Sequence, residues 1–289
     1  MNNNKSCAST SINWYPGHMA KTRKQIMQDL KLVDIVIELL DARIPISSQN
    51  PDIAQITAGK KKMLILNKCD LADERQNKLW VEYFNKKGIV AVLTDSNSGK
   101  GIDESIRQIE KIMEDNIKIQ NEKGRIGRKI RAMILGIPNV GKSSYINRIS
   151  KRTTAGVGNK PGVTKQKQWI RINDKIELLD TPGVLWPKFE DQQVGLKLAL
   201  LGSIKDQVVN MDDLALFACE YLMSEKPEIF DSVYHVEIAN TPYETLQNIA
   251  IKRGYLLKGE IDENRLMLSF VKDIRENKCG LITWEKPHA

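Results

Sequence analysis

The stretch Gly136-Ile-Pro-Asn-Val-Gly141-Lys142-Ser143 follows an apolar run at residues 130–135 and opens a segment with helical spacing at residues 142–150. A glycine-rich turn between a strand and a helix lets backbone N–H groups converge on phosphate oxygens at the positive end of the helix dipole. The spacing is that of a phosphate-binding loop. It predicts an α/β nucleotide-binding domain, and the alternative is an ordinary glycine-rich turn.

Two further motifs stand at the ends of apolar runs. Asn67-Lys-Cys-Asp70 follows residues 63–66, and Asp180-Thr-Pro-Gly183 follows residues 176–179, 38 residues after Lys142. The first pattern reads guanine, and the second binds Mg²⁺ and the γ-phosphate. In ordinary GTPases the guanine motif comes after both phosphate motifs, but here it precedes the phosphate loop by about seventy residues. This order predicts a GTP-binding domain whose chain is circularly permuted.

The phosphate motifs predict individual contacts. Lys142 is expected to reach the β- and γ-phosphates, and the Gly183 N–H to meet the γ-phosphate. Ser143 and Asp180 suit Mg²⁺. Thr164 is the candidate for the switch threonine that caps Mg²⁺ when the γ-phosphate is present. The alternative is that Thr164 is a surface threonine in a loop. The expected phosphate-binding set is Asn139, Val140, Gly141, Lys142, Ser143, Ser144 and Gly183, and the expected Mg²⁺ set is Ser143, Thr164 and Asp180.

The guanine motif predicts the base contacts. Guanine presents two neighbouring donors, N1–H and the 2-amino group, which the Asp70 carboxylate accepts together. Adenine lacks this pair and would leave the carboxylate without its partners, so the motif indicates GTP rather than ATP. Asn67 is expected to support the base and the nearby loops, and the Lys68 stem to cover the base plane. The base pocket is expected to close near Ser96.

Two features bear on hydrolysis. Val184 follows Gly183 where many GTPases carry a glutamine that positions the attacking water, and valine cannot do this. Another group or a partner must therefore hold the water. His18, in a polar and aromatic-rich motif, is one candidate, and the alternative is a packed or backbone-bonded histidine. Asn139 suits a K⁺ ion beside the β- and γ-phosphates, and its alternative is a turn asparagine.

Strands alternate with helices up to residue 187, which predicts a mostly parallel six-stranded sheet with helices on both faces. After residue 187 only helical patterns follow, which predicts a smaller all-α domain. The expected domains are a disordered tail at 1–13, the GTP-binding domain at 14–187 and the helical domain at 188–289. The expected strands are 34–40, 63–66, 89–93, 130–135, 168–172 and 175–179. The expected helices are 20–32, 75–87, 103–122, 142–150, 191–203, 206–224, 241–253 and 263–277.

Composition indicates which partners and which cellular compartment suit the protein. The 289 residues carry a net charge of +8, with 33 Lys/Arg against 19 Asp/Glu in residues 1–188 and 11 against 17 in the remainder. A basic half suggests a polyanionic partner, and the alternative is a solvated surface. Four scattered cysteines lack metal-ligand spacing, and the N-terminus has no apolar signal region. We therefore expect a cytoplasmic protein with no membrane association.

The motifs together resemble the bacterial ribosome biogenesis GTPase A family, in that family's permuted order. The matching stretches are Trp14-Tyr-Pro-Gly-His-Met-Ala, Asp41-Ala-Arg-Ile-Pro, Asn67-Lys-Cys-Asp, Gly136-Ile-Pro-Asn-Val-Gly-Lys-Ser, Pro161-Gly-Val-Thr and Asp180-Thr-Pro-Gly-Val-Leu-Trp-Pro. The resemblance covers nearly the whole chain from Trp14.

The resemblance implies a Mg²⁺-dependent GTPase in late assembly of the large ribosomal subunit, stimulated by that particle and monomeric away from it. It also implies a helical domain that contacts rRNA, His18 as a water-positioning residue and Asn139 as a K⁺ ligand. Because the C-terminal part is acidic, RNA contact there is expected from a local patch at Lys252, Arg253 and Lys258. Two other classes stay open. A metabolic NTPase would need additional chemistry in residues 190–289, and an RNA-binding scaffold would hold GTP with negligible turnover.

Overall fold

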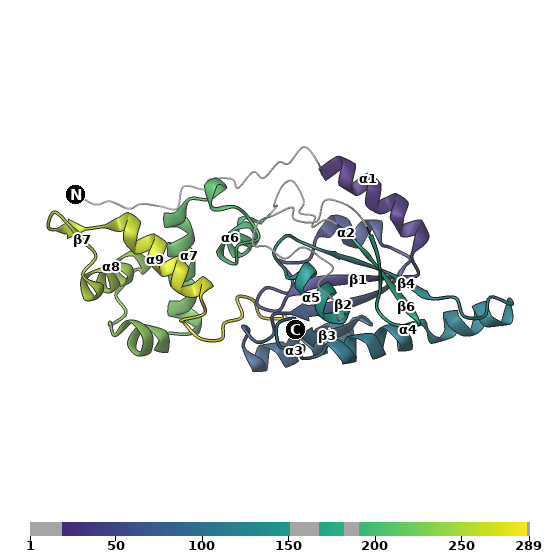
Figure 1. Ribbon diagram of the computed structural model, residues 1–289. Coiled ribbons are helices and arrows are strands. Elements are labelled where there is room, and N and C mark those ends of the chain that lie inside the picture. Colours follow the sequence, from purple (N-terminus) through teal and green to yellow (C-terminus); the bar gives the residue numbers. More distant parts are fainter. Residues whose placement is uncertain (1–18, 151–167, 182–190, 288–289) are drawn as a thin grey trace. The chain divides into compact units, whose positions relative to one another are not determined.

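The computed structural model describes residues 19–150, 168–181 and 191–287, with the side chains of residues 19–22 and 168 left out (Figure 1). The described chain falls into two compact units. Residues 19–181 with 281–287 form the GTPase unit, and residues 191–280 form the helical unit.

The GTPase unit is built on a six-stranded sheet. Its strands follow the order β3-β2-β1-β4-β6-β5, and every neighbouring pair is parallel except β5 with β6. The expected sheet is confirmed. The strands are β1 (Ile35–Asp41), β2 (Lys61–Asn67), β3 (Val90–Thr94), β4 (Ile130–Gly136), β5 (Gln168–Arg171) and β6 (Ile176–Asp180).

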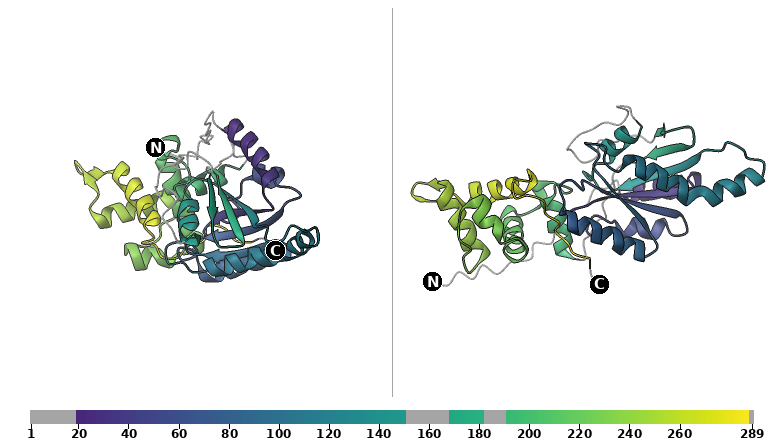
Figure 2. Two further views of the ribbon diagram at one scale, coloured as in Figure 1. Left: turned by 45° about the vertical axis from the view of Figure 1, so that its right-hand side comes forward. Right: turned by 90° about the horizontal axis from the view of Figure 1, so that it is seen from below.

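Helices cover both faces of this sheet, so the central strand β1 is buried along its whole length. Side chains on one face of the sheet, including Val36 and Met133, pack against Ile26 of α1 and Ile53 of α2. On the other face α4 and α5 pack against each other, with Ser105 Oγ and Tyr145 OH 2.8 Å apart. Figures 1 and 2 show α1 and α4 on opposite sides of the strands. The helices are α1 (Met19–Asp29), α2 (Pro51–Ile56), α3 (Glu74–Lys86), α4 (Ile102–Glu122) and α5 (Lys142–Ile149), with a 3₁₀ turn η1 (Leu30–Leu32) after α1.

The short helix α2 was not expected from the sequence. Its six residues are too few for a periodic pattern, but Asn50 accepts a hydrogen bond from the Asp52 N–H and Pro51 occupies the first turn. The cap and the proline explain why the chain turns helical here.

The helical unit packs its long helices around a core that includes Leu222, Phe230 and Phe270. Its elements are α6 (Gln192–Leu200), η2 (Asp206–Val208), α7 (Met211–Glu225), η3 (Phe230–Tyr234), α8 (Pro242–Arg253), β7 (Leu256–Leu257), β8 (Glu260–Ile261) and α9 (Glu263–Arg275). The hairpin β7–β8 departs from the all-α expectation. Lys258 and Gly259 both have positive φ, 52° and 87°, which is the geometry of a two-residue hairpin turn.

The chain leaves the helical unit before its C-terminus. Residues Leu281–Glu285, here called the strap, lie on the GTPase unit, where the Ile282 N–H donates to Leu71 O and the Trp284 N–H donates to Arg43 O. This differs from the expected helical domain ending at residue 289. The backbone pairs join residues more than 200 positions apart, so no local pattern indicates them. Among the described helices, none is long and apolar enough to span a membrane.

Candidate functional site

The phosphate loop connects the buried strand β4 to the first turn of α5. Its backbone is held in left-handed conformations, with φ of 60° at Asn139 and 96° at Gly141. A Cβ atom on Gly141 would lie 2.3 Å from the Asn67 Nδ2 atom. The glycine is therefore required twice, by its φ and by the close approach of a side chain from another loop. Val140, Ser143 and Ser144 complete the loop and the first turn of α5.

Lys142 and Asp180 are the buried charged groups of the phosphate side. Lys142 is 8% exposed and Asp180, the last residue of β6, is 1% exposed. Burial lowers the pKa of Lys142 to about 8, and the charge of Asp180 opposes part of this shift. A buried ammonium is costly unless an anion accompanies it, so polyphosphate is the ligand that this environment favours.

The donor chemistry beside Lys142 also suits a hard cation. Ser143 offers a hydroxyl oxygen at the first turn of α5, and Asp180 offers a carboxylate at the end of the neighbouring strand. Mg²⁺ prefers such oxygen ligands together with substrate phosphates. The residues present therefore fit this ion.

Asn67 joins the guanine motif to the phosphate loop. It ends β2, is 1% exposed, and donates from Nδ2 to Val140 O at 2.9 Å. Its Oδ1 accepts from Thr94 Oγ1 at 3.1 Å and from Ser96 Oγ at 2.7 Å. A single amide side chain thus connects three loops at the carboxyl edge of the sheet. Ser96, expected near the base, belongs to this network.

Lys68 lies beside a second charged pair that the sequence reasoning missed. Its Nζ donates to Asn139 O at 2.7 Å and to Asp41 Oδ2 at 3.0 Å. Arg43 in turn donates to both oxygens of Asp41, at 2.9 and 2.7 Å. Burial alone would raise the pKa of Asp41, but the charges of Arg43 and Lys68 outweigh burial and hold that pKa well below its usual range. No role was predicted for Asp41 or Arg43, although Asp41 ends β1 at the same sheet edge as the motif residues.

Asp70 follows this network and lies at the exposed surface. Partial desolvation raises the pKa of Asp70 above its usual value, and the nearby charge of Asp95 adds to the shift. Two hydrogen-bond donors would stabilise the negative charge of such a carboxylate, and the guanine edge supplies two donors. The predicted residues His18, Thr164 and Gly183 lie outside the described residues.

The geometry defines a class: a GTP-binding domain of the phosphate-loop type in which the strand of the guanine motif precedes the strand of the phosphate loop. A family model described as "50S ribosome-binding GTPase" matches residues 131–251. The chain is 43% identical to Ribosome biogenesis GTPase A of Bacillus pumilus over 96% of this chain and 100% of that protein. The chain belongs to the ribosome biogenesis GTPase A family.

Solved structures agree with this assignment. The chain resembles the GDP-bound structure of TM YlqF with a TM-score of 0.64 and 28% identity, covering 91% of this chain and 99% of that one. It resembles GNP-bound YlqF from T. maritima with a TM-score of 0.62 and the same identity, covering 93% and 99%. The permuted GTPase fold and the helical unit are therefore shared along almost the whole chain.

Proposed function

We propose that this GTPase acts as a switch on a precursor of the large ribosomal subunit, binding GTP with Mg²⁺ and hydrolysing it when the particle is engaged. The observation that carries the proposal is the Asn67 network, because it holds the guanine motif, the Ser96 loop and the phosphate loop in one arrangement. Membership of the ribosome biogenesis GTPase A family and the match to the 50S ribosome-binding GTPase family support the choice of nucleotide and particle.

Each predicted contact has a place in this proposal. Asp70 accepts the two guanine donors, and Lys142 neutralises the β- and γ-phosphates. Ser143 and Asp180, with Thr164, would hold Mg²⁺, which would neutralise charge on the phosphates. Lys68, Ser144 and the loop N–H groups of Val140 and Gly141 line the nucleotide. Asn139 would add K⁺ beside the phosphates.

His18 is proposed to position the attacking water. It directly precedes α1, which packs on the sheet through Ile26 and is followed after a short link by β1. A helix that leads into a parallel strand runs opposite to it, so the first turn of α1 lies toward the carboxyl edge of the sheet (Figure 1). That edge carries the phosphate loop, and this direction of α1 supports the role proposed for His18.

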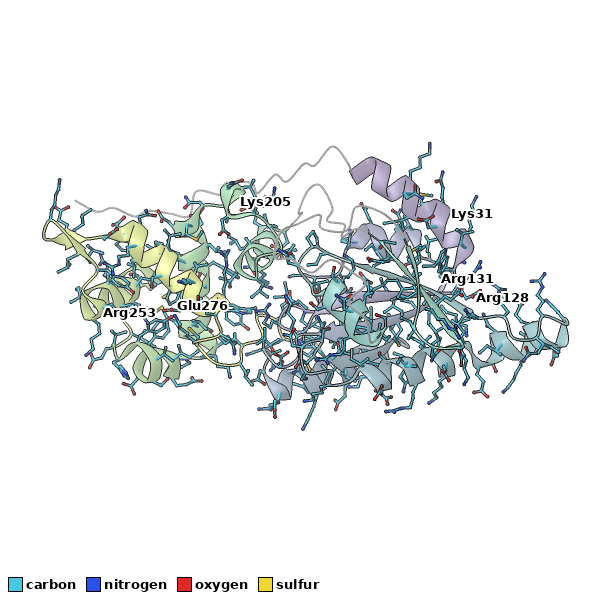
Figure 3. The ribbon with its side chains drawn as sticks, viewed as in Figure 1. Lys31, Arg128, Arg131, Lys205, Arg253 and Glu276 are labelled. Atoms are coloured by element: carbon cyan, nitrogen blue, oxygen red, sulfur yellow. The ribbon has the colours of Figure 1, made fainter. Side chains whose placement is uncertain are left out.

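Basic side chains support contact with rRNA. Lys31, Arg128 and Arg131 gather at the amino end of the sheet, away from the nucleotide edge (Figure 3), and Arg131 lies 5.2 Å from the ring of Trp169, which is 41% exposed. Arg128 also pairs with Asp34 at 2.8 Å. The RNA contact would therefore rest on Lys31 and on Arg131, because a cation beside an exposed aromatic suits a backbone with unstacked bases.

The patch expected on the helical unit is smaller than the sequence indicated. Arg253 is half-buried, donates to Asp273 Oδ2 at 2.6 Å and lies over the Tyr234 ring. Its guanidinium therefore serves the fold, while Lys252 and Lys258 are exposed. The RNA contact of this unit would rest on these two lysines.

The switch follows from where the phosphate motif ends. β6 ends at Asp180, and α6, the first helix of the helical unit, begins twelve residues later at Gln192. A γ-phosphate that holds Thr164 and Gly183 would therefore act on the connection between the units, and by linkage the particle would tighten GTP relative to GDP by the same factor. We propose that the protein is a monomer away from the particle.

Co-sedimentation with large-subunit precursors tests the proposal, with GDP and with a non-hydrolysable GTP analogue. Stronger binding with the analogue, and turnover that rises when particles are added, are expected. Equal binding in both states would remove the switch and favour an RNA-binding scaffold that holds GTP.

A further inference from the structure

The strap, Leu281–Glu285, contacts the loops that follow β1 and β2. The Ile282 N–H donates to Leu71 O at 3.4 Å, and the Asp73 N–H donates to Thr283 Oγ1 at 3.0 Å. The Trp284 N–H donates to Arg43 O at 2.7 Å. Trp284 itself is 1% exposed. The strap therefore pairs with both loops through backbone and side-chain bonds and is anchored by a buried indole.

Glu285 completes the attachment. Glu285 is 8% exposed, and its carboxylate accepts from the Ile46 N–H at 2.7 Å, from the Ser47 N–H at 3.0 Å and from the Ser47 hydroxyl. A carboxylate that receives several donors in a buried site is strongly oriented, because leaving those donors unpaired would cost their desolvation. The loop after β1 is thus held by a residue 238 positions away.

The two loops held by the strap carry the groups proposed above to contact guanine. Arg43, whose carbonyl accepts from Trp284, pairs with Asp41, and Asp41 accepts from Lys68. Leu71 follows Asp70 directly, and the Asp73 side chain caps α3 by accepting from two N–H groups. The segment that ends the guanine motif therefore lies between the strap on one side and the first turn of α3 on the other.

We propose that the strap is a positioning element for guanine recognition: it holds Asp70 and Lys68 in the geometry that reads the base. The inference rests on the guanine-reading role proposed above for Asp70. Only five residues separate α9 of the helical unit from the strap. A change in the helical unit that displaces the strap would therefore release the nucleotide faster. The helical unit would then act on the base side of the site as well as on the phosphate side.

The test uses full-length protein with Glu285→Ala, and Thr283→Val as a near-isosteric second variant that removes one acceptor. The matched control is Glu276→Ala, which removes an exposed acid whose ion pairs lie within the helical unit (Figure 3). Affinities and release rates are measured for GDP and for IDP, which lacks the 2-amino group. Thermal unfolding is measured alongside.

We expect Glu285→Ala to weaken GDP binding about tenfold, or about 1.4 kcal/mol, and IDP binding about threefold, so that the preference for GDP falls. Thr283→Val should lower the ratio of GDP affinity to IDP affinity by a smaller factor, and Glu276→Ala should leave this ratio unchanged. If the variants keep the wild-type GDP-to-IDP ratio, whatever their unfolding temperatures, the strap is only structural and the inference is overturned. A wild-type protein without preference for GDP over IDP would instead refute the proposed role of Asp70.

Discussion

Replacing Asn67 with alanine would remove the side chain that connects the guanine motif to the phosphate loop. Four hydrogen bonds are lost: the one that Asn67 donates to Val140 O, and the three that it accepts from Thr94 Oγ1, Ser96 Oγ and the Ser96 N–H. Each contributes about 1 kcal/mol, and leaving the buried Thr94 hydroxyl and Val140 carbonyl without these bonds adds about 1–3 kcal/mol. We therefore expect the free energy of unfolding to fall by roughly 5–7 kcal/mol.

Urea unfolding of Asn67→Ala and wild type, both without nucleotide, measures this loss, and Asn121→Ala at the exposed end of α4 is the matched control. The control should change the free energy of unfolding by less than about 0.5 kcal/mol. GDP affinity of the folded fraction should fall as well, because the loops are no longer held together. A loss below about 1 kcal/mol in Asn67→Ala would show that the network does not stabilise the site, and the reasoning would fail.

Four further predictions concern nucleotide binding and hydrolysis. Asp70→Asn should weaken GTP binding and shift preference toward XTP, because an amide donor suits the 2-oxo group; titrations with GTP, XTP and ATP measure this, and an unchanged GTP preference would contradict it. The pKa of Lys142 is lowered to about 8, and only the protonated amine attracts phosphate, so GDP affinity should fall about tenfold from pH 7 to pH 9 as that proton is lost. Lys142→Met should lack this dependence, and parallel pH profiles for the two proteins would exclude Lys142 as the cause. His18→Ala should lower particle-stimulated turnover while nucleotide affinity stays nearly constant, and equal stimulated rates would remove His18 from the reaction. In the same assay, turnover should be faster in K⁺ than in Na⁺ at matched ionic strength, through Asn139, and identical rates would argue against that ion.

Local sequence was sufficient for the sheet and for the order of its motifs. The apolar runs before Asn67, Gly136 and Asp180 become β2, β4 and β6 because short buried strands need continuous hydrophobic side chains. The phosphate loop is local in part, since the φ of 96° at Gly141 favours a glycine whatever surrounds the loop. The circular permutation could therefore be inferred from the linear order of the motifs alone.

Tertiary structure alone decided how the site is held together. The contact of Asn67 with Val140, the pairing of Asp41 with Lys68 and the attachment of Glu285 to Ser47 join residues 73, 27 and 238 positions apart. Such contacts depend on which strand ends become neighbours in the folded sheet, and residue patterns of period two or 3.6 carry no record of that. For the same reason the strap's return to the GTPase unit could not be inferred, because its hydrogen bonds are satisfied by loops at the opposite end of the chain.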